Sequence, residues 1–133
     1  MLGMRTYTKK YITACRSKVE ADLSAYKSLA ARGTGPGVFE SIFFNNMIIV
    51  MDHLFVHRLR GVEGKDGNPL NEVRMLSDSI MNNNQKLAID KSIAYDAAQS
   101  VLKVKLGDEI KVSEAGFQLL YKAFFAEIES KFL

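Results

Sequence analysis

The chain has 133 residues, of which 47% are hydrophobic and 25% are charged, and it contains only two prolines. These values suit one compact soluble domain, residues 1–133, with a core large enough to fold unaided. Cys15 is the single cysteine of the sequence, which excludes an intramolecular disulfide and makes a cytoplasmic setting the simplest interpretation. The net charge of +3 is concentrated in residues 1–32, where seven Lys or Arg stand against two acids. This basic stretch favours an anionic partner, although a solvated helix face explains the same lysines and is the preferred interpretation.

The first predicted element is a helix from about Thr6 to Arg32. Its apolar residues recur at three- and four-residue steps and form one stripe, which includes Tyr11, Cys15, Val19, Leu23 and Tyr26. A tight corner is expected where Thr-Gly-Pro-Gly follows, at residues 34–37. Because this connection is short, we expect the second helix to run antiparallel to the first.

The second predicted helix, from about Val38 to Arg60, is one long apolar run. One wide arc of its surface must be core, and it contains Phe43, Phe44, Met47, Ile48, Val50, Met51, Leu54 and Phe55. The opposite side mixes polar residues with Ile42, Ile49 and Val56. We therefore expect the helix to be covered on both sides, at the centre of a bundle or at the seam of a homodimer. Polar residues interrupt the run, so a membrane span is rejected.

Polar side chains set into this apolar helix are the strongest functional signal of the sequence, since such groups are costly to bury unless they are paired or have a task. We expect them to be mostly buried and either hydrogen-bonded to one another or lining a pocket; they are Asn46, Asp52, His53, His57 and Arg58. The expected partner of Arg58 is a carboxylate, supplied by Glu40, Glu63, Asp66 or Glu72.

The loop from Gly61 to Asn68 is rich in glycine and charge, and Asn68-Pro69 predicts the start of a third helix. Its free N–H groups, helped by Lys65, suit a small anion, and three arginines flank the loop: Arg58, Arg60 and Arg74. A well-formed turn and helix cap is the plainer alternative. The candidate ligand-binding residues here are Lys65, Asp66, Asn68 and Arg74.

The third helix is expected to end in the asparagine run at 82–84, and residues 85–100 show no clear pattern. Residues 101–112 alternate in polarity and predict a β-hairpin with a loop at 107–109. This register sets Leu106 beside Ile110 and Val104 beside Val112. A last helix follows, with Ser113 as its cap and its end at Phe132.

His53 and His57 face one way on a helix, at the spacing where two imidazoles chelate one metal, and Asp52, Glu63 or Asp66 would complete the set. The sequence has only two histidines and no His-Glu-x-x-His motif, so hydrogen-bonded histidines are favoured and no metal or other cofactor is expected. Cys15 falls in the apolar stripe and is expected to be an inert core thiol. No serine-nucleophile or nucleic-acid-binding motif is visible, so enzyme activity stays open and no nucleic-acid partner is expected.

The run FFNN…MDHLFVHRLR…EGKDGNPLNEVR, within residues 39–74, resembles a family of small uncharacterised bacterial proteins whose members repeat this block almost unchanged. The likeness is looser through the hairpin and the last helix. It implies a bacterial origin, and it supplies neither an activity nor catalytic residues.

The sequence thus predicts a mainly α-helical single domain, a bundle of four main helices with one β-hairpin before the last helix. Its predicted function is to bind a small anionic ligand at a polar site between the second helix and the loop from Gly61 to Asn68. The alternative is a structural or interaction protein, a homodimer whose buried polar groups only fix packing. A metal-dependent enzyme using His53 and His57 is the least favoured interpretation.

Overall fold

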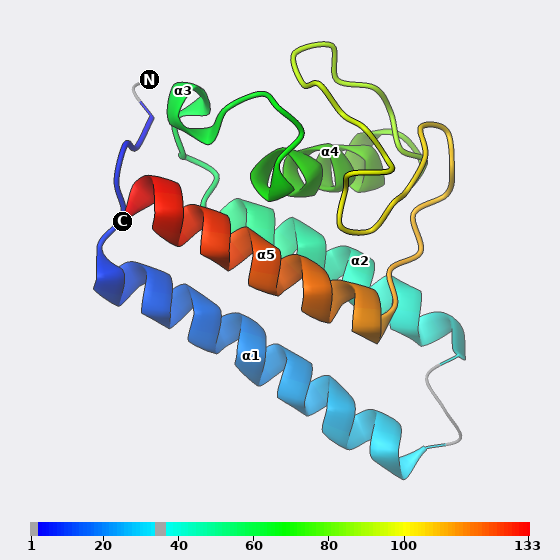
Figure 1. The fold of residues 1–133 in the computed structure, drawn as a ribbon. Coiled ribbons are helices and arrows are strands. Elements are labelled where there is room, and N and C mark those ends of the chain that lie inside the picture. Colours follow the sequence, from blue (N-terminus) through cyan, green and yellow to red (C-terminus); the bar gives the residue numbers. More distant parts are fainter. Residues whose placement is uncertain (1–2, 34–36) are drawn as a thin grey trace.

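The computed structural model describes residues 3–33 and 37–133, and the chain is mainly helical, as predicted (Figure 1). The helices of these residues are α1 (Lys9–Arg32), α2 (Gly37–Leu54), α3 (Arg60–Glu63), α4 (Pro69–Asn82) and α5 (Glu114–Phe132). The four long helices correspond to the four predicted ones, and the single turn of α3 is an addition to them. A tight corner was predicted at residues 34–37. Residues 34–36 lie outside the described residues.

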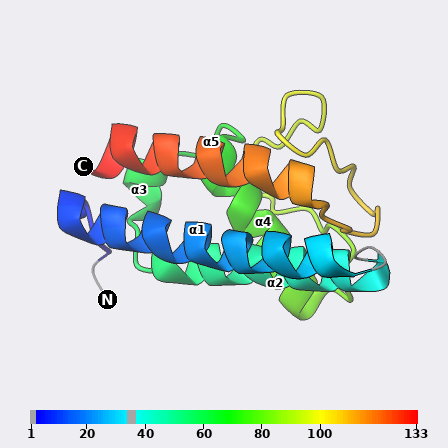
Figure 2. The ribbon, with the colours of Figure 1, turned by 90° about the horizontal axis from the view of Figure 1, so that it is seen from below.

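Helices α2 and α5 lie side by side in the middle of the packing. Helix α1 packs on α2 and α5, and α4 packs on the same two helices from the other side (Figures 1 and 2). The rings of Phe44 in α2 and Phe117 in α5 lie 5.3 Å apart, and both side chains are fully buried. None of the described helices is long and apolar enough to cross a bilayer.

Helix α2 ends at Leu54, so the prediction of one helix through Arg60 is wrong. The chain leaves the helix in tight turns and pairs with the N-terminal arm instead. The N–H of Met4 donates to the carbonyl of His57 (2.6 Å), and the N–H of Leu59 donates to the carbonyl of Met4 (2.9 Å). These bonds occupy backbone groups that further helical turns would need, because each backbone donor or acceptor must find a partner when it is buried.

The predicted β-hairpin at residues 101–112 is also wrong. Within the described ranges, β pairing is limited to two isolated bridges, Met4 with Arg58 and Lys86 with Glu109. The carboxylate of Glu72 accepts hydrogen bonds from the N–H groups of Val101 (2.8 Å) and Leu102 (2.9 Å), so these groups are withdrawn from any ladder. Lys103 then adopts a φ of 58°, which breaks an extended strand.

The second half of the expected hairpin pairs with an earlier segment. Leu87 receives a hydrogen bond from Gly107 (2.8 Å) and donates one to Asp108 (3.0 Å). Ile110 donates to the carbonyl of Gln85 (2.7 Å). Residues 105–110 therefore lie against residues 85–87, while the Leu106 side chain is exposed and not set against Ile110 as predicted.

Hydrogen bonds of the Asn45 side-chain amide join α2 to the irregular connection between α4 and α5. Nδ2 of Asn45 donates to the carbonyl of Ile110 (2.8 Å) and to Oε1 of Gln85 (3.0 Å), and its Oδ1 accepts from the N–H of Val112 (3.1 Å). Asn45 is buried, whereas Asn46, which the sequence analysis expected to be buried, is exposed. Neighbouring helix positions point about 100° apart, so only one of the two can face the connection.

We expect Asn45→Ala to lower the free energy of unfolding by about 3 kcal/mol, because the buried carbonyl of Ile110 and N–H of Val112 would lose their partner. Asn46→Ala is the matched control and should change it by less than about 0.5 kcal/mol. Urea denaturation of both variants measures the difference. Equal effects of the two substitutions would contradict the assignment.

Candidate functional site

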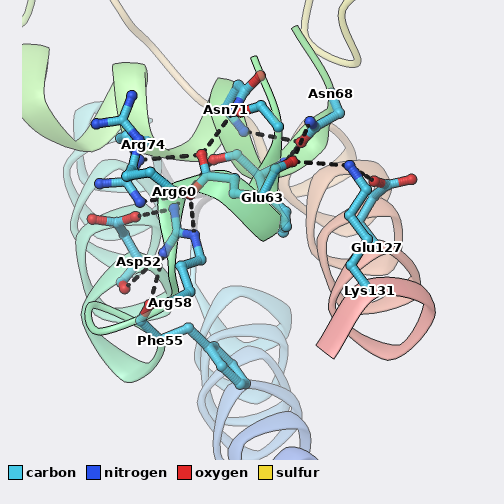
Figure 3. A network of polar contacts seen from close by, with 12 residues as sticks. Asp52, Phe55, Arg58, Arg60, Glu63, Asn68, Asn71, Arg74, Glu127 and Lys131 are labelled. Atoms are coloured by element: carbon cyan, nitrogen blue, oxygen red, sulfur yellow. Dashed lines mark hydrogen bonds and ion pairs between the residues drawn. The ribbon is translucent and has the colours of Figure 1, made fainter. Parts of the chain in front are cut away.

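The guanidinium of Arg58 is the centre of a buried polar network at the end of α2 (Figure 3). Its side chain is 0% exposed. Nε donates to Oε1 of Glu63 and Nη2 donates to Oδ1 of Asp52, each at 2.8 Å. Nη1 donates to the carbonyl of Phe55 (3.0 Å), and Nη2 also reaches that of Leu70 (3.2 Å). Every nitrogen of the guanidinium therefore has a partner, and a carbonyl just past the end of α2 receives a donor.

The carboxylate of Glu63 is the anionic counterpart, and it too is 0% exposed. Besides Arg58, Oε1 accepts from Nη2 of Arg74 (2.5 Å), while Oε2 accepts from Nε of Arg74 (3.1 Å) and Nδ2 of Asn71 (2.7 Å). Arg74 thus forms a bidentate pair with the carboxylate, the geometry in which arginine binds a carboxylate most strongly. These bonds tie α3 and α4 to the end of α2.

The network is electrically balanced, with two carboxylates and two guanidiniums. Burial by itself raises the pKa of Glu63, but the hydrogen bonds and charges of Arg74 and Arg58, with the amide of Asn71, outweigh it and hold the pKa below its usual value. Glu63 in turn more than offsets the burial of Arg74 and raises the pKa of that guanidinium. The anion held by Arg58 and Arg74 is therefore a side chain of the protein itself.

The loop before α4 is closed by Asn68, which caps the helix as predicted. Its Oδ1 accepts from the N–H groups of Leu70 (2.9 Å) and Asn71 (3.2 Å), and its Nδ2 donates to the carbonyl of Glu63 (2.9 Å). The ammonium of Lys131 in α5 donates to the same carbonyl (2.9 Å). The N–H groups that the anion prediction requires at this helix start are thus already occupied.

A close contact also fixes this loop from the other side. Gly67 has a φ of +86°, and a Cβ at this position would lie 2.5 Å from the carbonyl oxygen of Ala94. Only glycine fits such a conformation and approach. The N–H of Ala94 also donates to the carbonyl of Lys65 (2.8 Å), so residues 64–68 are held against the connection between α4 and α5.

The structure brings some of the predicted site residues together and separates others. Asp52, Arg58 and Arg74 meet in the network, and Asn68 adjoins it through Glu63. The carboxylate predicted for Arg58 is confirmed as Glu63, with Asp52 as a second partner. The remaining candidates are exposed: Asn46, His53, His57, Lys65 and Asp66.

The expected burial of the two histidines is wrong: both side chains are exposed, because α2 ends at Leu54 and the chain turns toward the N-terminal arm. Both nevertheless line a groove, together with Leu54 and Tyr11. In the part of the chain that the structure describes, no three His, Cys, Asp or Glu side chains are grouped as metal ligands would be. Cys15 is buried as predicted, and burial raises the pKa of its thiol.

Sequence reasoning missed Asn71 and named Glu72 only as a possible partner of Arg58, although both are buried in α4. Asn71 is covered by α3 and the loop that follows it, where it donates to Glu63 and Gly64. Glu72 is covered by the connection between α4 and α5, whose packing on α4 has no periodic pattern in residues 85–100 to predict it. Glu63 was considered only as one of four possible partners of Arg58.

A polar cleft of about 420 Å³ opens beside the network. Its charged and polar lining comes from Asp52, Arg60, Arg74, Ser77, Asp78, Asn82 and Asp90, and its apolar lining from Met75, Met81, Ala88 and Ile89. Arg60 donates from Nη2 to the hydroxyl of Ser92 (3.0 Å). Hydrogen bonds from Ser92, aided by the charges of Arg60 and Arg74, hold the pKa of Asp90 below its usual value.

Comparison with known proteins yields no match: no family model, curated protein or solved structure resembles this chain. The resemblance of residues 39–74 to a bacterial family stays a prediction. Function must therefore be inferred from the site itself.

We expect Glu63→Gln to lower the free energy of unfolding at pH 7 by about 3–5 kcal/mol, because Arg58 would keep its buried charge without a counterion. Glu129→Gln, which removes the partly exposed pair with Arg16, is the control and should cost less than about 1 kcal/mol.

The difference between wild type and Glu63→Gln should also depend on pH. Since the pKa of folded Glu63 is lowered, its stabilisation is present above the unfolded pKa of about 4.3 and is lost as pH falls through the lower, folded value. Denaturation curves from pH 7 downward should therefore converge at acid pH. A constant difference over that range would refute the role of the Glu63 charge.

Proposed function

We propose that the protein binds a small polar molecule bearing one anionic group, in the cleft between α3, α4 and residues 88–90. Arg60 holds the anionic group. This places the predicted anion site beside the network and not inside the loop from Gly61 to Asn68.

One observation carries the proposal. Among the described residues, Nε of Arg60 is a buried donor without a hydrogen-bond partner. A buried donor without a partner lowers stability by about 1–3 kcal/mol. Because Arg60 lines the cleft, an oxygen anion bound there would supply the missing hydrogen bond and recover this cost. By contrast, Arg58 and Arg74 already hold Glu63, so Arg60 is the guanidinium of the cleft that is not committed to a buried carboxylate.

The other charges of the cleft define the rest of the ligand. Asp52, Asp78 and Asp90 outnumber the arginines that face them, so a multiply charged anion would be repelled. Hydroxyl or amino groups on the ligand suit these carboxylates as donors. The volume of about 420 Å³ lies in the usual range for small-molecule sites, about 300–1,000 Å³.

We expect glycerate and serine, which each carry one carboxylate beside hydroxyl or amino groups, to shift the amide resonances of Arg60, Ile89 and Asp90 in two-dimensional NMR. Arg60→Gln should weaken binding at least tenfold, which corresponds to about 1.4 kcal/mol. Arg32→Gln, at the exposed end of α1, is the matched control and should leave the affinity unchanged. Equal binding by Arg60→Gln, or the absence of shifts at the cleft in wild type with both probes, would contradict the proposal.

A second candidate function, assembly as a homodimer, is favoured by a separate observation. Ile42, on the side of α2 that the sequence analysis expected to be covered, is 52% exposed, and Val38 and Phe39 at the start of the helix are exposed as well. Exposed apolar side chains along one helix favour association with another apolar surface.

If α2 mediates a homodimer, light scattering at micromolar concentration should give twice the monomer mass of 14.9 kDa. Ile42→Glu should then yield the monomer, since it buries a charge in the seam. Leu119→Glu, a similar change at an exposed leucine of α5, should leave the dimer intact. A monomeric wild type would refute this candidate.

A further inference from the structure

A second cavity lies at the end of α2, and its lining differs from that of the Arg60 cleft in being mainly apolar. It is a groove of about 630 Å³ between the N-terminal arm, the first turn of α1 and the end of α2. Its walls are mainly apolar or aromatic and come from Met4, Tyr7, Tyr11, Leu54 and Val56, while Thr6, Thr8, His53 and His57 supply polar atoms.

The walls of this groove are held in place before any ligand binds. The hydroxyl of Tyr11 donates to the carbonyl of Leu54, which joins α1 to the end of α2. The rings of Tyr7 and Tyr11 stack at 5.5 Å, and the ring of Phe55 meets Tyr7 edge-on at 5.0 Å. The N–H of Tyr7 also donates to the carbonyl of Phe132 (2.6 Å). A preformed apolar site binds more tightly because less conformational freedom is lost.

Basic residues adjoin the lining of the groove in the sequence. None of the lining residues is acidic, and the exposed residues Arg5, Lys9 and Lys10 stand next to or near Met4, Thr6 and Thr8 in the chain. The first turn of α1 contains no acidic residue to balance them. The nearest carboxylate along α2, that of Asp52, is bound to Arg58 on the other side. An apolar groove with a basic border complements a molecule that has an apolar body and a negative end.

We infer that this groove binds a soluble amphiphile with a hydrocarbon body and a carboxylate head, of the medium-chain fatty acid class. The hydrocarbon lies against Leu54, Val56 and the tyrosine rings. The carboxylate receives hydrogen bonds from His53 or His57 and lies in the positive field of the arm. The inference does not depend on the Arg60 cleft, because the two cavities share no lining residue.

Isothermal titration calorimetry with decanoate, kept below its micelle-forming concentration, tests this inference. Wild type should bind decanoate and bind decanol, which has the same chain without the charge, at least tenfold more weakly. Val56→Asp and Thr6→Glu each set a carboxylate at the groove and should weaken decanoate binding at least tenfold. Leu119→Asp, the same kind of change on exposed α5, should bind as wild type does.

Controls separate the inference from its alternatives. Circular dichroism verifies that each variant is folded. If Val56→Asp does not fold, the decanoate affinity of Thr6→Glu, a substitution on the exposed arm, tests the groove instead. Arg60→Gln should bind decanoate with wild-type affinity, so the proposal for the Arg60 cleft and the inference for the groove can be refuted independently. The inference is overturned if wild type does not bind decanoate, if decanol binds equally well, or if a folded groove variant keeps wild-type affinity. Binding to phosphatidylglycerol vesicles without binding to decanoate would also overturn it and assign the groove to a membrane surface.

Discussion

The buried ion pair between Arg58 and Glu63 is the constraint on which the rest of this structure depends. Moving two charges out of water costs several kcal/mol for each ion, and this cost is recovered only when every lone pair and proton is satisfied. Here the guanidinium reaches two carboxylates and three carbonyls, and the carboxylate receives donors from two arginines and an amide. The partners come from the end of α2, from α3 and from α4, so these three elements must meet at one point.

This requirement explains features of the fold that would otherwise be unfavourable. A single helical turn such as α3 is unstable in isolation, because the first turn fixes several residues for one hydrogen bond. It forms here because it carries Glu63 to Arg58 and Arg74, and because Asn68 and Lys131 hold its last carbonyl. Helix α2 likewise stops where Arg58 turns back toward it, although the apolar pattern continues beyond Leu54.

The sequence was sufficient to predict the four long helices, because each of them has an apolar face with helical period and three of them begin at a capping residue, namely Thr8, Asn68 and Ser113. It was not sufficient for the connection between α4 and α5. There Leu102, Val104 and Leu106 alternate as they would in a strand, but only Leu102 and Val104 pack on the core, and Leu106 is exposed. Glu72 accepts hydrogen bonds from the backbone donors of Val101 and Leu102. A buried carboxylate that replaces strand pairing is a tertiary effect, and it leaves no local pattern.

The candidate site was predicted in the same partial way. Polar residues in the apolar run correctly indicated a hydrogen-bonded group around Asp52 and Arg58, and Arg58 correctly required a carboxylate. The choice between Asn45 and Asn46, and the orientation of His53 and His57, depended on which side the later chain would cover. That information lies in the path of residues 83–113 and in the premature end of α2, and neither can be read from a helical wheel.

The composition of the network supports the proposal of a binding protein over that of a purely structural one. A buried ion pair that served packing alone could be replaced by apolar residues of similar volume, often without loss of stability. This chain instead concentrates charge at one place, and two members of the network, Asp52 and Arg74, also line an open cleft. His53 and Leu54, which follow Asp52 in α2, line the groove. The network thus forms part of the wall of the polar cleft, while the groove is lined by neighbouring residues of the chain and by no member of the network. Rigid packing at the end of α2 preorganises the cleft, and this gain offsets part of the desolvation cost of the ion pair.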